Sequence, residues 1–385
     1  LVDLYTDATQ EPHRAVPHLE AILASRPDHE RALSAAEALL ENRAVAGRVA
    51  AALSDAYGKL GTTSRELELL NMELKLARGP RRLEVQRRLG LLRREQGDPT
   101  GAMELLGPVV AAEPGDDEVR EAYVDLALSL EQPGAAARLL SRALSSCKEP
   151  VARARVGADI GTVYLRSGDV KRAQAAFQQV LESGEDERAM LVSSRHLVDI
   201  FTESGDTHGL AGALDACVRH EPDAEARQSA ARRLAKLAEG ELGDTARAMT
   251  AWSALVDSPW ADEALTRLTA LCEASGDHAR MVDVLEKRAA RAKSPEDARE
   301  LALRAAELRT SQGGDRAEAL DAWRAFIAKY GSTRDAHAKM IPLLEQEQLW
   351  KELAWVLERD IELAPQGEWP VLLSRLAQIR LQRLE

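Results

Sequence analysis

Histidine and cysteine are among the side chains in this sequence that could bind a metal or act in covalent catalysis. The eight histidines are scattered along the chain. His13 and His18 are five positions apart, which places them on different faces of a helix. His196, His208 and His220 lie within one stretch but have no cysteine or carboxylate at ligand spacing. We therefore expect solvated or helix-capping histidines, with no metal and no cofactor.

The three cysteines, Cys147, Cys217 and Cys272, are far apart, odd in number and form no CxxC pair. They fall where helix residues should be buried, so we interpret them as small apolar core residues. The sequence also lacks a GxGxxG loop, a P-loop lysine and a GxSxG nucleophile motif. We therefore predict that the chain is not an enzyme, and any catalytic domain would have to lie outside these residues.

Composition narrows the class of protein further. The 385 residues carry a net charge of −12, which argues against nucleic acid as a partner. No apolar run is long enough for a membrane span, and the first residues do not resemble a signal peptide, so we expect a cytoplasmic protein with no membrane insertion. Alanine, leucine, glutamate and arginine dominate and strand-like runs are absent, which favours an all-α fold.

A Gly-Asp pair recurs at intervals of 33 to 38 residues, and we interpret it as the turn of a repeated helical hairpin. Glycine tolerates the left-handed backbone that ends a helix, and the next Asp or Thr can cap the following helix. Other residues hold the equivalent places in three repeats. The turn positions are Gly61-Thr62, Gly97-Asp98, Glu131 with Pro133-Gly134, Gly168-Asp169, Gly205-Asp206, Gly243-Asp244, Gly276-Asp277, Gly314-Asp315 and Gln348-Leu349.

Two packing positions follow each turn, five and nine residues later. After residue 168 the pairs alternate between two types. One type combines a small residue with an aromatic residue, and the other combines a larger residue with leucine, so both fill a similar volume. This predicts a unit of two hairpins, about 71 residues long, with two kinds of interface between repeats. The successive pairs are Ala173/Phe177, Leu210/Leu214, Ala248/Trp252, Met281/Leu285, Ala319/Trp323 and Leu353/Leu357.

Two segments carry a family resemblance. They are Leu89-Gly90, Gly97, Ala102, Leu106, Pro114 and Ile160-Gly161, Tyr164, Gly168, Ala173, Phe177. Both resemble the tetratricopeptide repeat, which implies an all-α, right-handed superhelical solenoid of antiparallel helix hairpins. We expect one solenoid over residues 1–385, with about nine repeats, partial repeats at both ends and an irregular insertion helix at 28–46. The chain lacks an initiating Met and ends inside a helical pattern, so we expect a fragment of a longer array.

In such arrays the first helix of each hairpin lines the concave face, and the resemblance places a track of arginines there. It suits an acidic peptide or a terminal carboxylate, although an ordinary solvated face would look the same. The asparagines that clamp a carboxylate in chaperone-binding relatives are absent. The candidate partner-binding residues are Arg87, Arg94, Arg155, Arg166, Arg195, Asp199, Arg233 and Arg304. Glu121, Asp125, Glu203 and Glu273 share that face.

Six tryptophans offer a second kind of contact. Trp252 and Trp323 occupy packing positions and are predicted to be core residues. For Trp260, Trp355 and Trp369 we leave two alternatives open, burial between hairpins and exposure as contact anchors.

The fold implied by the resemblance favours a scaffold or adaptor that binds a protein or peptide on its concave surface. Similarity in composition to large myxobacterial tetratricopeptide proteins implies a role in motility, polarity or cell-surface assembly, with an acidic protein or a small Ras-like GTPase among the partners. The alternative is a regulatory sensor whose superhelix changes pitch when it binds a short peptide or small ligand.

Overall fold

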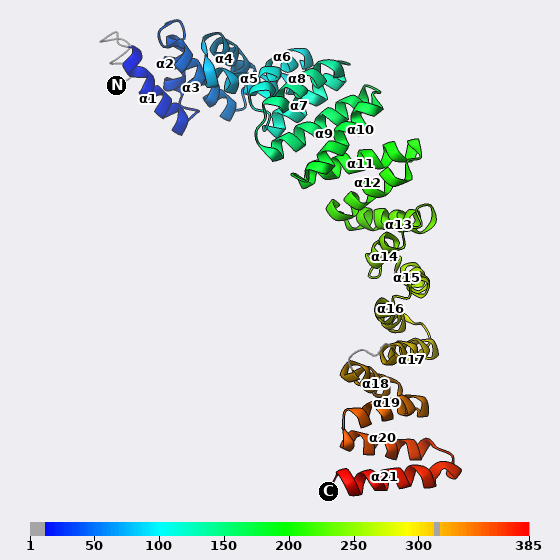
Figure 1. The fold of residues 1–385 in the computed structure, drawn as a ribbon. Helices are drawn as coiled ribbons and strands as arrows, with labels where there is room; N and C mark the ends of the chain where they lie inside the picture. Colours follow the sequence, from blue (N-terminus) through cyan, green and yellow to red (C-terminus); the bar gives the residue numbers. More distant parts are fainter. Residues whose placement is uncertain (1–11, 312–315, 385) are drawn as a thin grey trace. The chain divides into compact units, whose positions relative to one another are not determined.

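The computed structural model describes residues 12–311 and 316–384, and within these ranges the chain is helical with no β-strand. It divides into two compact units, residues 1–220 and 221–385, which are described separately. The all-α expectation is confirmed (Figure 1). Whether the units continue as one array of about nine repeats stays a prediction.

Unit 1 contains twelve described helices. They are α1 (Pro12–Ser25), α2 (Glu30–Leu39), α3 (Ala46–Lys59), α4 (Thr63–Leu76), α5 (Gly79–Glu95), α6 (Pro99–Ala112), α7 (Asp117–Ser129), α8 (Pro133–Ser146), α9 (Pro150–Arg166), α10 (Val170–Ser183), α11 (Glu187–Ser204) and α12 (Thr207–His220). From α3 onward, each odd-numbered helix packs against the next one as a hairpin. Neighbouring first helices also touch, α5 with α7, α7 with α9 and α9 with α11. Segment 28–46 contains the short α2, and α1 packs on both α2 and α3.

Unit 2 continues the same helical pattern over its described residues. Its helices are α13 (Ala224–Gly240), α14 (Thr245–Ser253), α15 (Ala261–Ser275), α16 (His278–Arg291), α17 (Pro295–Ser311), α18 (Arg316–Tyr330), α19 (Arg334–Gln346), α20 (Trp350–Leu363), the 3₁₀ turn η2 (Gln366–Glu368) and α21 (Trp369–Arg383). Each helix from α13 to α21 packs against the next in the chain, with η2 between α20 and α21.

The turns have the backbone geometry that the sequence predicts. Gly97 and Gly168 have φ angles of 77° and 81°, and the glycines of the other described Gly-Asp turns are also left-handed. The two non-glycine substitutes, Glu131 at φ 57° and Gln348 at φ 56°, adopt the same conformation. A residue with a side chain is strained in the left-handed conformation, whereas glycine is not. The predicted turn at Gly314-Asp315 lies outside the described residues.

The predicted helix caps are confirmed wherever aspartate follows a described turn glycine. Asp98 accepts a hydrogen bond from the Gly101 amide at 2.9 Å, and Asp169 accepts one from the Arg172 amide at 3.1 Å. Asp206, Asp244 and Asp277 make the same contact. Thr62 is different, because its side chain makes no capping hydrogen bond, so that part of the prediction is wrong.

The alternating packing pairs are buried throughout, as predicted. The Phe177 ring fits because residue 161 has no side chain, since a Cβ there would lie 2.4 Å from the ring. The ring also stacks on His196, with centroids 5.0 Å apart. A substitution at Gly161 would therefore force the two helices of this hairpin apart.

The two core tryptophans have polar partners that the sequence did not predict. The Trp252 indole N–H donates to Glu239 at 3.1 Å, and the Trp323 indole N–H donates to the Thr310 hydroxyl at 2.8 Å. Each acceptor lies 13 residues before its tryptophan, and the two tryptophans lie 71 residues apart. This recurrence agrees with a repeating unit of two hairpins.

Candidate functional site

The first-helix surface of unit 1 is formed by α5, α7, α9 and α11 and carries six of the predicted partner-binding residues. Arg87 and Arg155 form ion pairs with carboxylates at the start of the next first helix. Arg87 on α5 contacts Asp116 at 2.6 Å and Glu118 at 2.5 Å, at the start of α7. Arg155 on α9 contacts Asp186 at 3.0 Å, at the start of α11, and also pairs with Asp117. These arginines therefore join consecutive hairpins.

Asp116 and Asp186 each have two roles, as the ion-pair partner of an arginine and as the N-cap of a helix. Each caps its helix, Asp116 by accepting from the Val119 amide and Asp186 by accepting from the Ala189 amide. Burial alone would raise both carboxyl pKa values, but the arginine and the capping amide outweigh it, so both pKa values are lowered. Both carboxylates stay charged and fix the register between neighbouring first helices.

Arg120, deeper under the same surface, was not among the predicted residues. Its side chain is 3% exposed and binds Asp159 on α9, Asp117 at 2.7 Å and the carbonyl oxygen of Pro114 at 2.8 Å. Burial of Asp159 raises the pKa of its carboxyl to about 6, despite the opposing effect of Arg120. This arginine is a buried link between α7 and α9.

Asp159 should make the stability of unit 1 depend on pH. Its carboxyl pKa is about 6 when folded, against an ordinary value of 3.8, so its stabilising contribution is full below pH 3.8 and is lost as the pH rises through 6. Between pH 4.5 and 7.5 this contribution should fall by about 2 kcal/mol. We expect urea unfolding at the two pH values to show that loss in the wild type and a smaller loss in Asp159→Asn. Equal pH dependence of the two proteins would contradict it.

The structure brings four other charged residues together where the first helices end. Arg94 on α5 contacts Asp125 on α7 at 3.3 Å, and both side chains are exposed. Asp125, Leu128, Glu131 and Arg166 line, with Pro133, a surface pocket of about 490 Å³. Arg166 is exposed and makes no ion pair with another described residue. Arg166 is therefore a charge on this surface that an acidic partner could bind.

The remaining predicted residues are not brought into one site. Arg195 and Asp199 are exposed on α11, whereas Arg233 and Arg304 belong to unit 2. Arg304 pairs with Glu273 at 2.7 Å. Of the acidic residues expected on the same face, Glu121 pairs with Arg188 at 2.9 Å and Glu203 is exposed.

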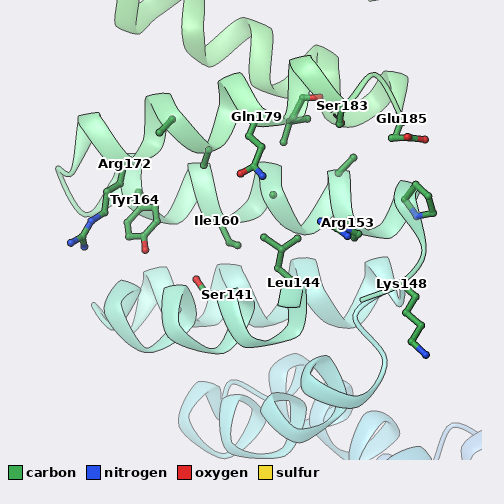
Figure 2. A pocket seen from close by; sticks show the side chains of 16 residues that line it. Ser141, Leu144, Lys148, Arg153, Ile160, Tyr164, Arg172, Gln179, Ser183 and Glu185 are labelled. Carbon is green, nitrogen blue, oxygen red and sulfur yellow. Dashed lines mark hydrogen bonds between the residues drawn. The ribbon is translucent and has the colours of Figure 1, made fainter. Parts of the chain in front are cut away.

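A groove that the sequence did not predict lies between α8 and α10, the second helices of two consecutive hairpins of unit 1. It has a volume of about 550 Å³, and α9 forms its floor (Figure 2). Ala154, Gly157, Ile160 and Tyr164 of α9 line it at helical spacing. In the sequence this stripe looks like an ordinary core face, so only the separation of α8 and α10 reveals the groove.

The cysteines and His29 follow expectation, whereas His196, which is half-buried against the Phe177 ring, and His337 do not. All three cysteines are free and buried, and burial raises the pKa of the Cys272 thiol, which makes it unreactive. His29 caps α2 by accepting from the Ala32 amide at 3.1 Å. His337 is neither solvated nor capping, which corrects the prediction, because it is fully buried and its Nδ1 lies 3.2 Å from Asp360. Among the described residues, no group of three or more side chains could hold a metal ion.

The tryptophans divide between core and surface. Trp252 and Trp323 are at most 1% exposed, which confirms them as core residues. Trp355 and Trp369 are 44% and 38% exposed, so neither is buried between hairpins. Trp260 is partly buried, with the Arg232 guanidinium 5.8 Å from its ring centroid.

The fold and these surfaces define a protein built from α-helical hairpin repeats, the class whose surfaces serve protein–protein interaction. Residues 93–146, from the end of α5 to the end of α8, match the tetratricopeptide repeat family. This segment therefore matches the family that the sequence predicts. A search of curated proteins found no match. None of the helices in the described part of the chain has the length and apolarity needed to cross a bilayer.

Several solved structures resemble the chain at low sequence identity. The complex of Naa15 and Naa10 bound to HypK-THB aligns over 99% of this chain with 14% identity and a TM-score of 0.44, and the chain spans 65% of the length of the matched protein. YrrB, a TPR protein with an unusual peptide-binding site, aligns over 51% of this chain and 100% of its own, with 15% identity and a TM-score of 0.36. The C-terminal part of a TPR protein from Cytophaga hutchinsonii covers 83% of this chain and 97% of its own, with 12% identity and a TM-score of 0.35.

Proposed function

We propose that the chain is a non-catalytic interaction scaffold of the cytoplasm that binds an acidic protein or peptide on the first-helix surface of unit 1. The observation that carries the proposal is the exposed, unpaired Arg166 beside the Arg94–Asp125 pair, above a pocket of about 490 Å³. A carboxylate of the partner would make a charge-assisted hydrogen bond with its guanidinium. A small GTPase with an acidic surface is one partner of this kind.

The internal ion pairs support this role. Arg87 and Arg155 each join two consecutive first helices through aspartates that also cap them. A surface held in this way is formed before a partner arrives, so little conformational entropy is lost on binding. Within this proposal Arg155 and Arg87 shape the surface, and Arg166 makes the contact.

The test uses an array of Asp/Glu-rich peptides of about 12 residues, a length that extends over several helical repeats. We expect Arg166→Glu to weaken binding of the selected peptides by about tenfold or more, the equivalent of one charge-assisted hydrogen bond, with no change in Tm. Arg138→Glu is the matched control, because Arg138 is exposed on the second helix α8 and lies outside the pocket.

The variant Arg155→Glu distinguishes a residue that stabilises the first-helix surface from one that contacts the partner. It should lower the Tm of unit 1, because it places a third carboxylate beside Asp117 and Asp186. Peptide binding that survives Arg166→Glu unchanged would exclude the first-helix surface as the binding site.

A further inference from the structure

We propose that the groove between α8 and α10 is a second binding site, which takes an amphipathic helix of a protein partner with acidic residues at one end. The groove has a volume of about 550 Å³, and α9 lies between its α8 and α10 walls (Figure 2). Its walls are the second helices α8 and α10, and its floor residues on α9 do not include the predicted partner-binding residues Arg155 and Arg166. No residue of the groove lines the pocket beside Arg166.

Small side chains keep the groove open. Its floor contains Ala154 and Gly157, and its α10 wall contains Ala175 and Ala176. Ala154 is buried at 4% exposure, Ile160 at 6% and Val180 at 3%, so apolar groups cover the bottom. A ridge of apolar side chains from a partner would fill this space and remove more apolar surface from water.

The shape of the groove favours a helix over an extended peptide. Three helices line it, and their backbone groups are already hydrogen-bonded within the helices, so an extended chain would find few partners for its own backbone there. A helix satisfies its own backbone and needs only an apolar stripe. From Arg153 to Tyr164 the floor includes twelve residues of α9, separated by eleven helical steps. This corresponds to about 16 Å, or three turns of a docked helix.

Charged side chains at the two ends of the groove determine the direction in which a partner helix would bind. Lys148 and Arg153 lie at one end of the groove, are exposed and make no ion pair with a described carboxylate. Arg172, at the other end, already pairs with Asp169 at 3.4 Å. Glu185, the single acidic residue of the lining, lies at the same end as Lys148 and Arg153, so that end carries two cations and one carboxylate (Figure 2). In a chain of net charge −12, this local excess of positive charge complements an acidic helix end.

The test uses a helical peptide of about 14 residues, with leucines at i, i+3, i+4 and i+7 and glutamates at one end. Its binding to the full chain is measured by fluorescence anisotropy. We expect Ala175→Trp, which fills the groove from an exposed position on α10, to weaken binding by about tenfold or more. Lys148→Glu combined with Arg153→Glu should weaken it to a similar extent. Circular dichroism of each variant checks that the fold is kept.

Matched controls come from the same helix. Gln178→Trp and Lys171→Glu change exposed residues of α10 that do not line the groove, and both should bind like the wild type. Arg166→Glu should also leave this binding unchanged, so failure here is distinguishable from failure of the first-helix surface. The proposal is overturned if the wild type does not bind the acidic peptide, if Ala175→Trp binds it equally well, or if lysines in place of the glutamates bind as tightly.

Discussion

Replacing Arg120 with methionine is expected to lower the free energy of unfolding of unit 1 by about 3–5 kcal/mol at pH 7.5. The substitution leaves Asp159 and Asp117 without the cation that both contact, under a surface where Arg120 itself is 3% exposed. The loss should be smaller at pH 5, because Asp159, whose carboxyl pKa is already raised to about 6, then takes up a proton. Urea unfolding at the two pH values, with hydrogen exchange of the α7 and α9 amides, measures both effects.

Arg87→Met is the control for this prediction. Arg87 also bridges α5 and α7, but its side chain is 37% exposed and its partner Glu118 is 63% exposed. Solvent screens such pairs, so we expect a loss of at most about 1 kcal/mol. If Arg87→Met lowered the free energy of unfolding as much as Arg120→Met, the burial of Arg120 would not explain its larger expected contribution to stability.

Trp323→Ala is expected to destabilise unit 2 by about 3–5 kcal/mol, because it removes a fully buried ring and leaves a cavity between α17 and α18. Trp323→Phe should recover most of this loss, since it restores apolar volume and lacks only the hydrogen bond to the Thr310 hydroxyl. Thermal and urea unfolding followed by circular dichroism compare the two variants.

Trp355→Ala provides the matched control on α20, in the next hairpin of unit 2. Its ring is 44% exposed, so we expect a change within about 0.5–1 kcal/mol. If Trp323→Ala and Trp355→Ala had equal effects, the packing position nine residues after the turn would not have the structural importance that the repeat pattern assigns to it.

The internal charges change how the first-helix surface is understood. The sequence presents Arg87, Arg94, Arg155 and Arg166 as equivalent members of one track. In the structure the first three are paired with carboxylates of the neighbouring hairpin, while Arg166 has no such pair. Much of this positive charge therefore stabilises the arrangement of the repeats, and fewer residues are left to contact a partner.

The sequence by itself determined the features that depend on short-range geometry. The left-handed residue at Gly168, the cap at Asp169 and the buried pair Ala173 and Phe177 all lie within ten residues of one another. The same order of turn, cap and packing position recurs after Gly97, Gly205, Gly243 and Gly276. Local backbone preferences and helical periodicity fix these relations, so spacing alone predicts them.

Only the tertiary structure decided which charges are free and where the surface is hollowed. Arg120 meets Asp159 across 39 residues, and Arg155 meets Asp186 across 31, so each pairing depends on how one hairpin stacks on the next. The groove above Gly157 likewise exists because α8 and α10 stand apart on either side of α9. Stacking angles follow from the sum of many side-chain contacts, and no single spacing in the sequence encodes them.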